Sequence, residues 1–338
     1  MDVLLSLPIA SYLLSPSATS WSTSLNLLFF YMTWTTLILS HSPLKIRLFG
    51  TFGLRVALWL IPSLVTLLFD LGLPSLAESI KLGGRSALPP RDPRRLLRQL
   101  GLALFNLVFI TAVEGLSSLA FAWIFQEPDF KTSSALPLPW QIAKHILLLL
   151  AAREVLCYNL HRRVLHGGST LARYHGQYAH ARAAAPYSLE LFADHPLALL
   201  VHRFLPIYLP ALLLRPHLLT YFLFLALCTA EETLTMSGYS IVPGIIMGGI
   251  ARRCAIHYAG QGASNYGAWG LLDWVNGTSR GRHVLEDVKA EAEKHHLKER
   301  SANKIDDGAG MLQNGIDAWR SGNGPRRSPR TKSTKQAA

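Results

Sequence analysis

The feature that most constrains this chain is a series of long apolar stretches that carry almost no charge. They cover residues 21–40, 49–71, 101–125 and 138–160. A helix that crosses the hydrocarbon of a bilayer needs about 20 apolar residues, so each stretch is long enough to span a membrane. Charged residues make up 16% of the chain, against about 25% in an average soluble domain. The sequence therefore predicts an all-α, polytopic membrane helical bundle.

A fifth apolar stretch, residues 197–230, is interrupted by Pro206, Pro210 and Pro216. Because proline ends or kinks a helix, this stretch predicts two short helices that form a hairpin dipping into the membrane. The glycine-rich segment 241–250 is too short to span a bilayer, and we interpret it as interfacial or buried.

The distribution of charge predicts the orientation in the membrane. The loop over residues 81–98 is rich in proline and arginine, and the positive-inside rule places such a loop in the cytosol. The fourth span then returns the chain to the cytosol at His161. The basic residues flank apolar spans and are not interleaved with aromatic residues, which excludes nucleic acid as the expected partner of this chain of net charge +12.

Composition divides the chain into three parts. Residues 1–136 hold the N-terminal spans and the basic loop, and residues 137–278 hold the fourth span, the hairpin and most of the histidines. In the remaining part, 279–338, the charged stretch 283–307 predicts a surface helix. From residue 323 onward there is no large apolar side chain, which predicts a disordered tail that contacts anionic lipid.

Six of the 13 histidines fall near membrane ends that this topology places on one face. Imidazole is the commonest nitrogen ligand for iron, zinc and copper, so we predict that the six bind metal jointly as a cytosolic histidine-rich cap. They are His161, His166, His175, His180, His195 and His257.

The first two of these histidines converge only if their helix changes its course. They are five residues apart, which is about 140° around a straight helix. Gly167 and Gly168 follow at once, and glycine commonly ends a helix. The other histidines have ordinary roles: hydrogen bonding for His145 and His217, and a surface contact for His202. His295 and His296 are interpreted as a solvated pair.

Acidic residues near membrane depth need a reason, because an ionisable group there is costly. Glu231 and Glu232 end the hairpin, and Asp194 adjoins a candidate ligand. Each has three open roles: ligating metal, hydrogen-bonding a ligand histidine, or pairing with arginine. Glu114 and Glu154 are interpreted as structural partners of arginine.

Four segments in order resemble the fatty acid hydroxylase/sterol desaturase superfamily. Residues 157–166, CYNLHRRVLH, are similar to its first histidine box, which closes a transmembrane helix. Residues 174–180, YHGQYAH, with a His-Pro downstream, resemble the second box. Residues 236–243, MSGYSIVP, resemble its His-Ser-Gly-Tyr segment. Residues 256–279, IHYAGQGASNYGAWGLLDWVNGTS, resemble the last box. The order and spacing match over about 138–278.

The resemblance implies a helical protein of the endoplasmic reticulum with a cytosolic non-haem diiron site. Members of the superfamily use dioxygen and take electrons from cytochrome b5 or an NAD(P)H-linked reductase. They hydroxylate or desaturate lipids and sterols. By this resemblance the six histidines are iron ligands, and Glu231 or Glu232 completes the ligand shell.

Several positions depart from the superfamily pattern. The paired histidines of the second box are absent, and His180 lies one place further on. The pair after His257 is also absent, and Met236 stands where the family has histidine. The sequence therefore leaves two candidates for the metal, iron and another divalent ion, and it leaves three functions open. They are a metal-dependent hydroxylase or desaturase acting on a lipid, sterol or other apolar metabolite, an inactive membrane scaffold or lipid-binding relative, and a single-metal or acid–base enzyme of another reaction type.

Overall fold

The computed structural model describes residues 21–242, 246–282, 286 and 289. Throughout these ranges the secondary structure is helical, and no β-strand is present. Judged by length and composition, four helical stretches in this part of the chain can cross a membrane. They are Pro43–Gly72, Pro93–Phe125, Pro196–Leu214 and Leu218–Thr235. The prediction of an all-α, polytopic membrane protein is confirmed.

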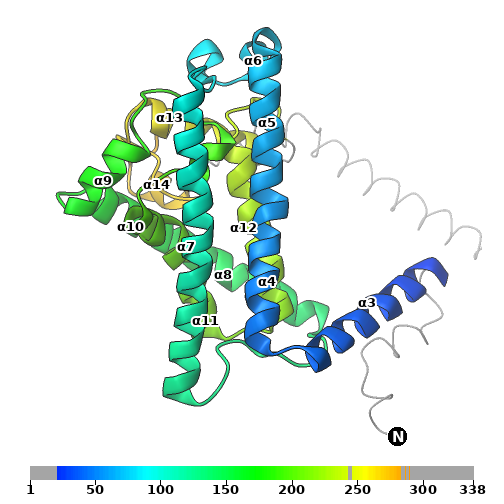
Figure 1. Ribbon diagram of the computed structural model, residues 1–338. Coiled ribbons are helices and arrows are strands. Elements are labelled where there is room, and N and C mark those ends of the chain that lie inside the picture. Colours follow the sequence, from blue (N-terminus) through cyan, green and yellow to red (C-terminus); the bar gives the residue numbers. More distant parts are fainter. Residues whose placement is uncertain (1–20, 243–245, 283–285, 287–288, 290–338) are drawn as a thin grey trace, which may run out of the picture. The chain divides into compact units, whose positions relative to one another are not determined.

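The first two stretches pack against each other as long rods (Figure 1). They consist of α4 (Pro43–Arg55), the π-helical turn η1 (Val56–Leu60), α5 (Ile61–Gly72) and α7 (Pro93–Phe125). The side chains of Ser42 and Asp92 accept hydrogen bonds from the first turns of α4 and α7, and a proline follows each cap. Because caps and N-terminal prolines start helices, both rods begin before the predicted spans 49–71 and 101–125.

The predicted fourth span is a helix, α8 (Pro139–Leu160), but it is not among the four apolar stretches. It carries Lys144, Arg153 and Glu154, which lower its apolar character. The N-terminal helix α3 (Trp21–Ser40) forms as predicted, and its described apolar run, Leu25–Ser40, is shorter than those four stretches.

The predicted hairpin of short helices is wrong in length. Its two arms are each long and apolar enough to cross a membrane. The first arm is continuous through α10 (Pro196–Leu199), the π-helical turn η5 (Leu200–Phe204) and α11 (Leu205–Leu214), and the second arm is α12 (Leu218–Thr235). Pro206 lies just after the π-helical turn η5 and Pro210 lies inside α11, so the helix continues past two positions that lack a backbone N–H. The chain reverses at Arg215, which has a left-handed backbone with φ of 45°.

Short elements gather at one end of these helices (Figure 1). They are α6 (Pro74–Ile80), η2 (Gly84–Ala87), η3 (His161–Leu165), α9 (Thr170–Tyr178), η4 (Ser188–Phe192), α13 (Met247–Ala259) and α14 (Leu271–Val275). The glycine-rich segment 241–250 leads into α13, and its residues 243–245 lie outside the described ranges. The predicted surface helix over 283–307, its histidine pair and the tail from residue 323 also fall there, apart from residues 286 and 289.

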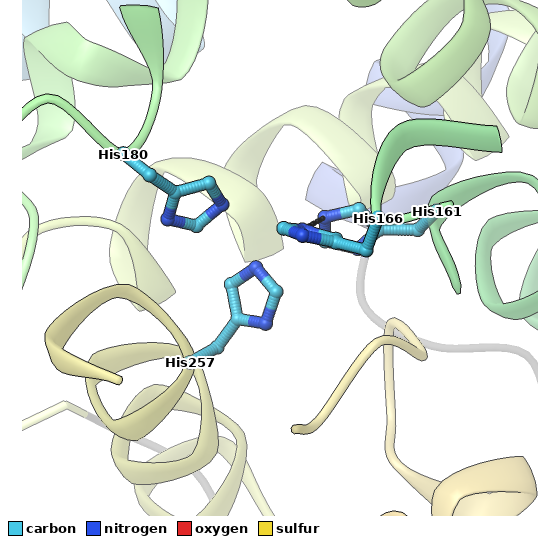
Figure 2. Close-up of side chains that lie close together, drawn as sticks. All are labelled: His161, His166, His180 and His257. Atoms are coloured by element: carbon cyan, nitrogen blue, oxygen red, sulfur yellow. Dashed lines mark hydrogen bonds between the residues drawn. The ribbon is translucent and has the colours of Figure 1, made fainter. Parts of the chain in front are cut away.

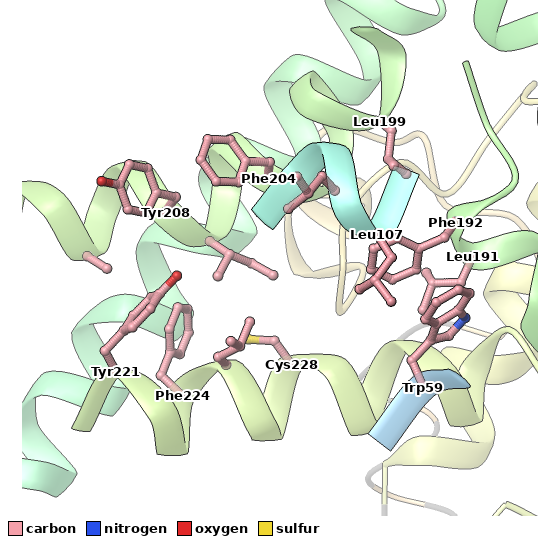
Figure 3. Close-up of a cluster of buried hydrophobic side chains, with 14 of the residues drawn as sticks. Trp59, Leu107, Leu191, Phe192, Leu199, Phe204, Tyr208, Tyr221, Phe224 and Cys228 are labelled. Carbon is pink, nitrogen blue, oxygen red and sulfur yellow. The ribbon is translucent and has the colours of Figure 1, made fainter. Parts of the chain in front are cut away.

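The hydrophobic core joins the long helices to these short elements (Figure 3). Tyr221 and Phe224 of α12 lie in the same cluster as Tyr208 of α11. At the other end of the cluster, the ring of Trp59 packs on Phe192 of η4 at a centroid distance of 4.1 Å. The core therefore fixes η4, and the loop that follows it, against the transmembrane rods.

Buried ion pairs connect the rods at membrane depth. Glu114 of α7 pairs with Arg55 of α4 at 2.9 Å and accepts a hydrogen bond from the hydroxyl of Tyr221 at 2.9 Å. Arg47 pairs with Asp129 after the end of α7. The predicted pairing of Glu114 with an arginine is confirmed.

Candidate metal centre

Six histidines converge among the short elements. Their ring nitrogens form two overlapping groups, in each of which the candidate ligand atoms lie within 4.8 Å of one another. The first group is His161, His166, His180 and His257, and the second is His161, His175 and His202. Figure 2 shows the four rings of the first group turned toward one another.

A π-helical turn brings His161 and His166 together. Residues 161–165 form η3, and the N–H of His166 donates to the carbonyl of His161 at 3.0 Å. A π-turn places residue i+5 next to residue i, unlike the α-helix. The two Nε2 atoms lie 3.2 Å apart. The predicted change of course is therefore this turn at the end of α8, ahead of the two glycines.

The close approach of the loop after α13 to His166 requires glycine. Gly262 has φ of +80°, a conformation that L-residues rarely adopt. A Cβ there would lie 2.8 Å from Nε2 of His166 and closer still to other atoms of that ring. Gly262 therefore lets the loop close over one edge of the cluster.

The structure corrects the prediction for His202. That prediction, a surface contact beside Arg203, is wrong, because the imidazole is buried and its centroid lies 3.9 Å from that of His161. It projects from the π-helical turn η5. The signal in the sequence is a polar residue inside an otherwise apolar stretch of span length, which generally marks a functional position.

His195 is placed differently from the other predicted ligands. Its ring stacks on Tyr174 at a centroid distance of 4.4 Å, and its Nδ1 accepts a hydrogen bond from the N–H of Leu197. It belongs to neither group of converging nitrogens. Among the remaining histidines, His145 hydrogen-bonds to the carbonyl of Gln141, as predicted.

Hydrogen bonds fix the orientation of three cluster imidazoles. His161 donates from Nδ1 to the carbonyl of Tyr266 at 3.0 Å, and His257 donates to the carbonyl of Ser264 at 2.6 Å. His175 donates to the carboxylate of Asp194 at 2.6 Å. In each ring the proton is thus on Nδ1, and Nε2 keeps the lone pair that binds a metal.

The cluster contains buried nitrogens with no hydrogen-bond partner. They are Nε2 of His175, Nε2 of His257 and both ring nitrogens of His180. Buried polar atoms are nearly always satisfied, so each of these needs an explanation. Metal coordination by Nε2 supplies one, and the donor set is of the kind that transition metals take. The residues present therefore fit a metal centre.

Burial keeps the cluster histidines neutral. Desolvation, followed by the neighbouring imidazoles, lowers the pKa of His166 to about 3. Desolvation lowers the pKa of His257 to about 4, and it lowers the pKa of His161 and of His180 as well. Neutral imidazole is the form that binds metal, so the cluster is ready to bind at physiological pH.

The acidic candidates are engaged in separate ways. Glu231 and Glu232 both pair with Arg153, at 3.1 and 2.9 Å, and Glu232 also pairs with Arg203 at 3.3 Å. Asp194 holds His175, as already described. Of the three roles open to these acids, arginine pairing fits the two glutamates, and support of a ligand histidine fits Asp194.

A cavity of about 60 Å³ borders the cluster. His161, His202 and His257 form part of its wall, as do Met236 and Cys254. A water molecule needs roughly 10–15 Å³ of such space. The cavity therefore admits molecules of a few atoms next to the imidazoles.

One known protein family matches the part of the chain that holds the histidine cluster. Residues 146–278 match the family model described as fatty acid hydroxylase. The match begins in α8 and ends at Thr278, and it includes all six converging histidines and Asp194. No solved structure matches the chain.

Proposed function

We propose that the chain is a membrane-bound, metal-dependent oxidoreductase of the fatty acid hydroxylase/sterol desaturase superfamily, and the match of residues 146–278 to the fatty acid hydroxylase family model supports this. In this proposal it hydroxylates or desaturates an apolar lipid- or sterol-like substrate with dioxygen. The observation that carries the proposal is the convergence of six imidazoles, several with buried, unpartnered Nε2 atoms.

The six imidazoles divide into two sets of three without sharing a residue. One set is His166, His180 and His257, and the other is His161, His175 and His202. Three protein ligands leave coordination positions free, as oxygen-activating iron sites require. Two irons held by these residues would supply the chemistry that, with dioxygen and two electrons from a reductase, oxidises an unactivated C–H bond.

The chain's own residues prepare this site. The carbonyls of Ser264 and Tyr266 and the carboxylate of Asp194 hold imidazoles with Nε2 facing inward. The small cavity beside the cluster limits the water near the reacting centre. Apolar side chains exposed along α7 and α12, such as Val108 and Leu227, face the bilayer from which an apolar substrate enters.

The setting follows from the same proposal. The histidines lie on the cytosolic face of the endoplasmic reticulum, and cytochrome b5 or a reductase supplies electrons. The basic loop over residues 81–98 then also faces the cytosol.

The test is turnover by the full chain reconstituted in lipid nanodiscs with ferrous iron, dioxygen and a reductant. Mass spectrometry of a panel of fatty acyl lipids and sterols should find one substrate that gains an oxygen atom or loses two hydrogens. His161→Ala should abolish the product, and His145→Ala, which changes a histidine outside the cluster, should not. An equal yield from wild type and His161→Ala contradicts the proposal.

A single-metal enzyme is the second candidate, because His161 belongs to both groups of nitrogens. Its Nδ1 is occupied by the carbonyl of Tyr266, so only Nε2 is available. If His161 completes the four-histidine group, the other group keeps two imidazoles. One metal per chain, with hydrolytic or acid–base turnover and no oxygen uptake, would support this candidate.

A further inference from the structure

We propose that Glu154 and Asp273 are positioning residues for the metal centre. They hold the loop over residues 264–272, whose carbonyls orient His161 and His257. The inference rests on the proposed metal binding, and it assigns a role to two carboxylates that contact no histidine themselves.

Asp273 fixes the peptide that receives His161. Its carboxylate is fully buried and accepts hydrogen bonds from the N–H of Tyr266 at 2.9 Å and the N–H of Gly267 at 2.6 Å. The peptide bond between those residues is trans, so its N–H and its carbonyl point in opposite directions. Holding the N–H of Gly267 on one side therefore aims the carbonyl of Tyr266 at Nδ1 of His161 on the other.

Glu154 ties the same loop to the helix that carries His161. It lies in α8, seven residues before that histidine, and accepts hydrogen bonds from the N–H of Trp269 at 2.8 Å and the N–H of Leu271 at 3.0 Å. Glu154 thereby holds the loop against the same helix that carries the imidazole of His161. The distance between His161 and the carbonyl of Tyr266 is set by this connection.

The two carboxylates meet at Gly267. A Cβ at this position would lie 2.7 Å from Oε1 of Glu154 and 3.0 Å from Oδ2 of Asp273. The loop thus passes between two anionic groups, and its N–H groups point away from the histidines toward them. Its carbonyls remain free to accept hydrogen bonds from imidazole N–H groups, which makes the opposite ring nitrogen a better donor to metal.

Asparagine at position 273 would break this arrangement with little change of shape. One of its two atoms is an NH₂ donor, so at least one of the N–H groups of Tyr266 and Gly267 would face another donor. The peptide would rotate and His161 would lose its acceptor. Losing such a partner of a metal ligand typically weakens metal binding by about 10–100-fold.

The experiment is a Co²⁺ titration of the chelator-treated full chain in detergent, with the visible spectrum recorded at each step. Asp273→Asn and Glu154→Gln should weaken Co²⁺ binding by about 10–100-fold and alter the spectrum, which reports ligand number and geometry. Glu190→Gln is the matched control, because that half-buried carboxylate pairs with Arg182, away from the histidines. A purely structural role would lower thermal stability and leave the Co²⁺ spectrum of the folded protein unchanged.

A double-mutant cycle makes the test specific. In the His161→Ala background, Asp273→Asn should cause a much smaller further loss of Co²⁺ affinity, because its effect passes largely through that histidine. If Asp273→Asn does not give folded protein, Glu154→Gln decides in the same way. Folded variants with wild-type affinity and spectrum overturn the inference. Failure of the wild-type chain to bind Co²⁺ counts instead against the proposed metal centre.

Discussion

Replacing Gly262 with alanine should displace one histidine from the cluster. The backbone at Gly262 has φ of +80°, and a Cβ would lie 2.8 Å from Nε2 of His166 and nearer to other ring atoms. Non-bonded carbon contacts need about 3.5 Å, so the ring must retreat by roughly 1 Å or more. The left-handed backbone adds about 1–2 kcal/mol of strain. We expect metal affinity to fall by at least about 10-fold, as when ligand support is lost.

Substitutions at two further glycines serve as controls that distinguish backbone strain from steric clash. Gly84 also has positive φ, +54°, and Gly176 lies in a helix; a Cβ at either would meet nothing within 4 Å. Gly84→Ala should lower the unfolding temperature without changing metal affinity, and Gly176→Ala should change neither property adversely. The assay is metal titration of the detergent-solubilised variants beside thermal unfolding. Equal metal affinity in Gly262→Ala and Gly84→Ala would refute the reasoning.

Three other expectations concern the same structure. Asp194→Asn should weaken metal binding by about 10–100-fold, because Asp194 holds the tautomer of His175; an unchanged affinity on titration speaks against that role. Glu114→Gln leaves Arg55 buried without its charge partner and should cost about 3–5 kcal/mol in detergent unfolding, whereas Glu127→Gln at an exposed pair should cost under about 1 kcal/mol. The metal-free protein should lose stability as pH falls below about 6.5, because the unfolded chain then binds protons that the cluster histidines, with their lowered pKa, do not; a melting temperature that stays level from pH 8 to pH 5 contradicts this.

The membrane class was predictable because the apolar character and the length of the spans are local properties of the sequence. The helices α4 and α7 begin earlier than predicted because Ser42 and Asp92 cap them. These capping residues, each followed by a proline, are local features that can be recognised in the sequence. How α8 accommodates its charged residues was not predictable in the same way. The charge of Arg153 is balanced by Glu231 and Glu232, about 80 residues further on, and that pairing depends on tertiary packing.

The candidate site shows the same division. The sequence indicated that His161 and His166 need a bend to converge, but not that the bend is a π-turn. His202 was missed because its neighbour Arg203 suggested a surface position, whereas η5 turns the imidazole inward. Asp194 was considered because it adjoins His195, yet in the structure its carboxylate reaches His175 while the imidazole of His195 stacks on Tyr174. Adjacent residues in an irregular segment commonly point in different directions, and sequence alone does not resolve which of them faces inward.

The central claim, that the converging histidines hold catalytic metal, is tested most directly by the metal content of the purified full chain in detergent. The account predicts about two iron atoms per chain, as in two-metal sites, and their loss from a His161→Ala variant that remains folded. No stoichiometric metal, with folding unchanged by a chelator, would contradict the claim and favour a membrane scaffold without metal chemistry.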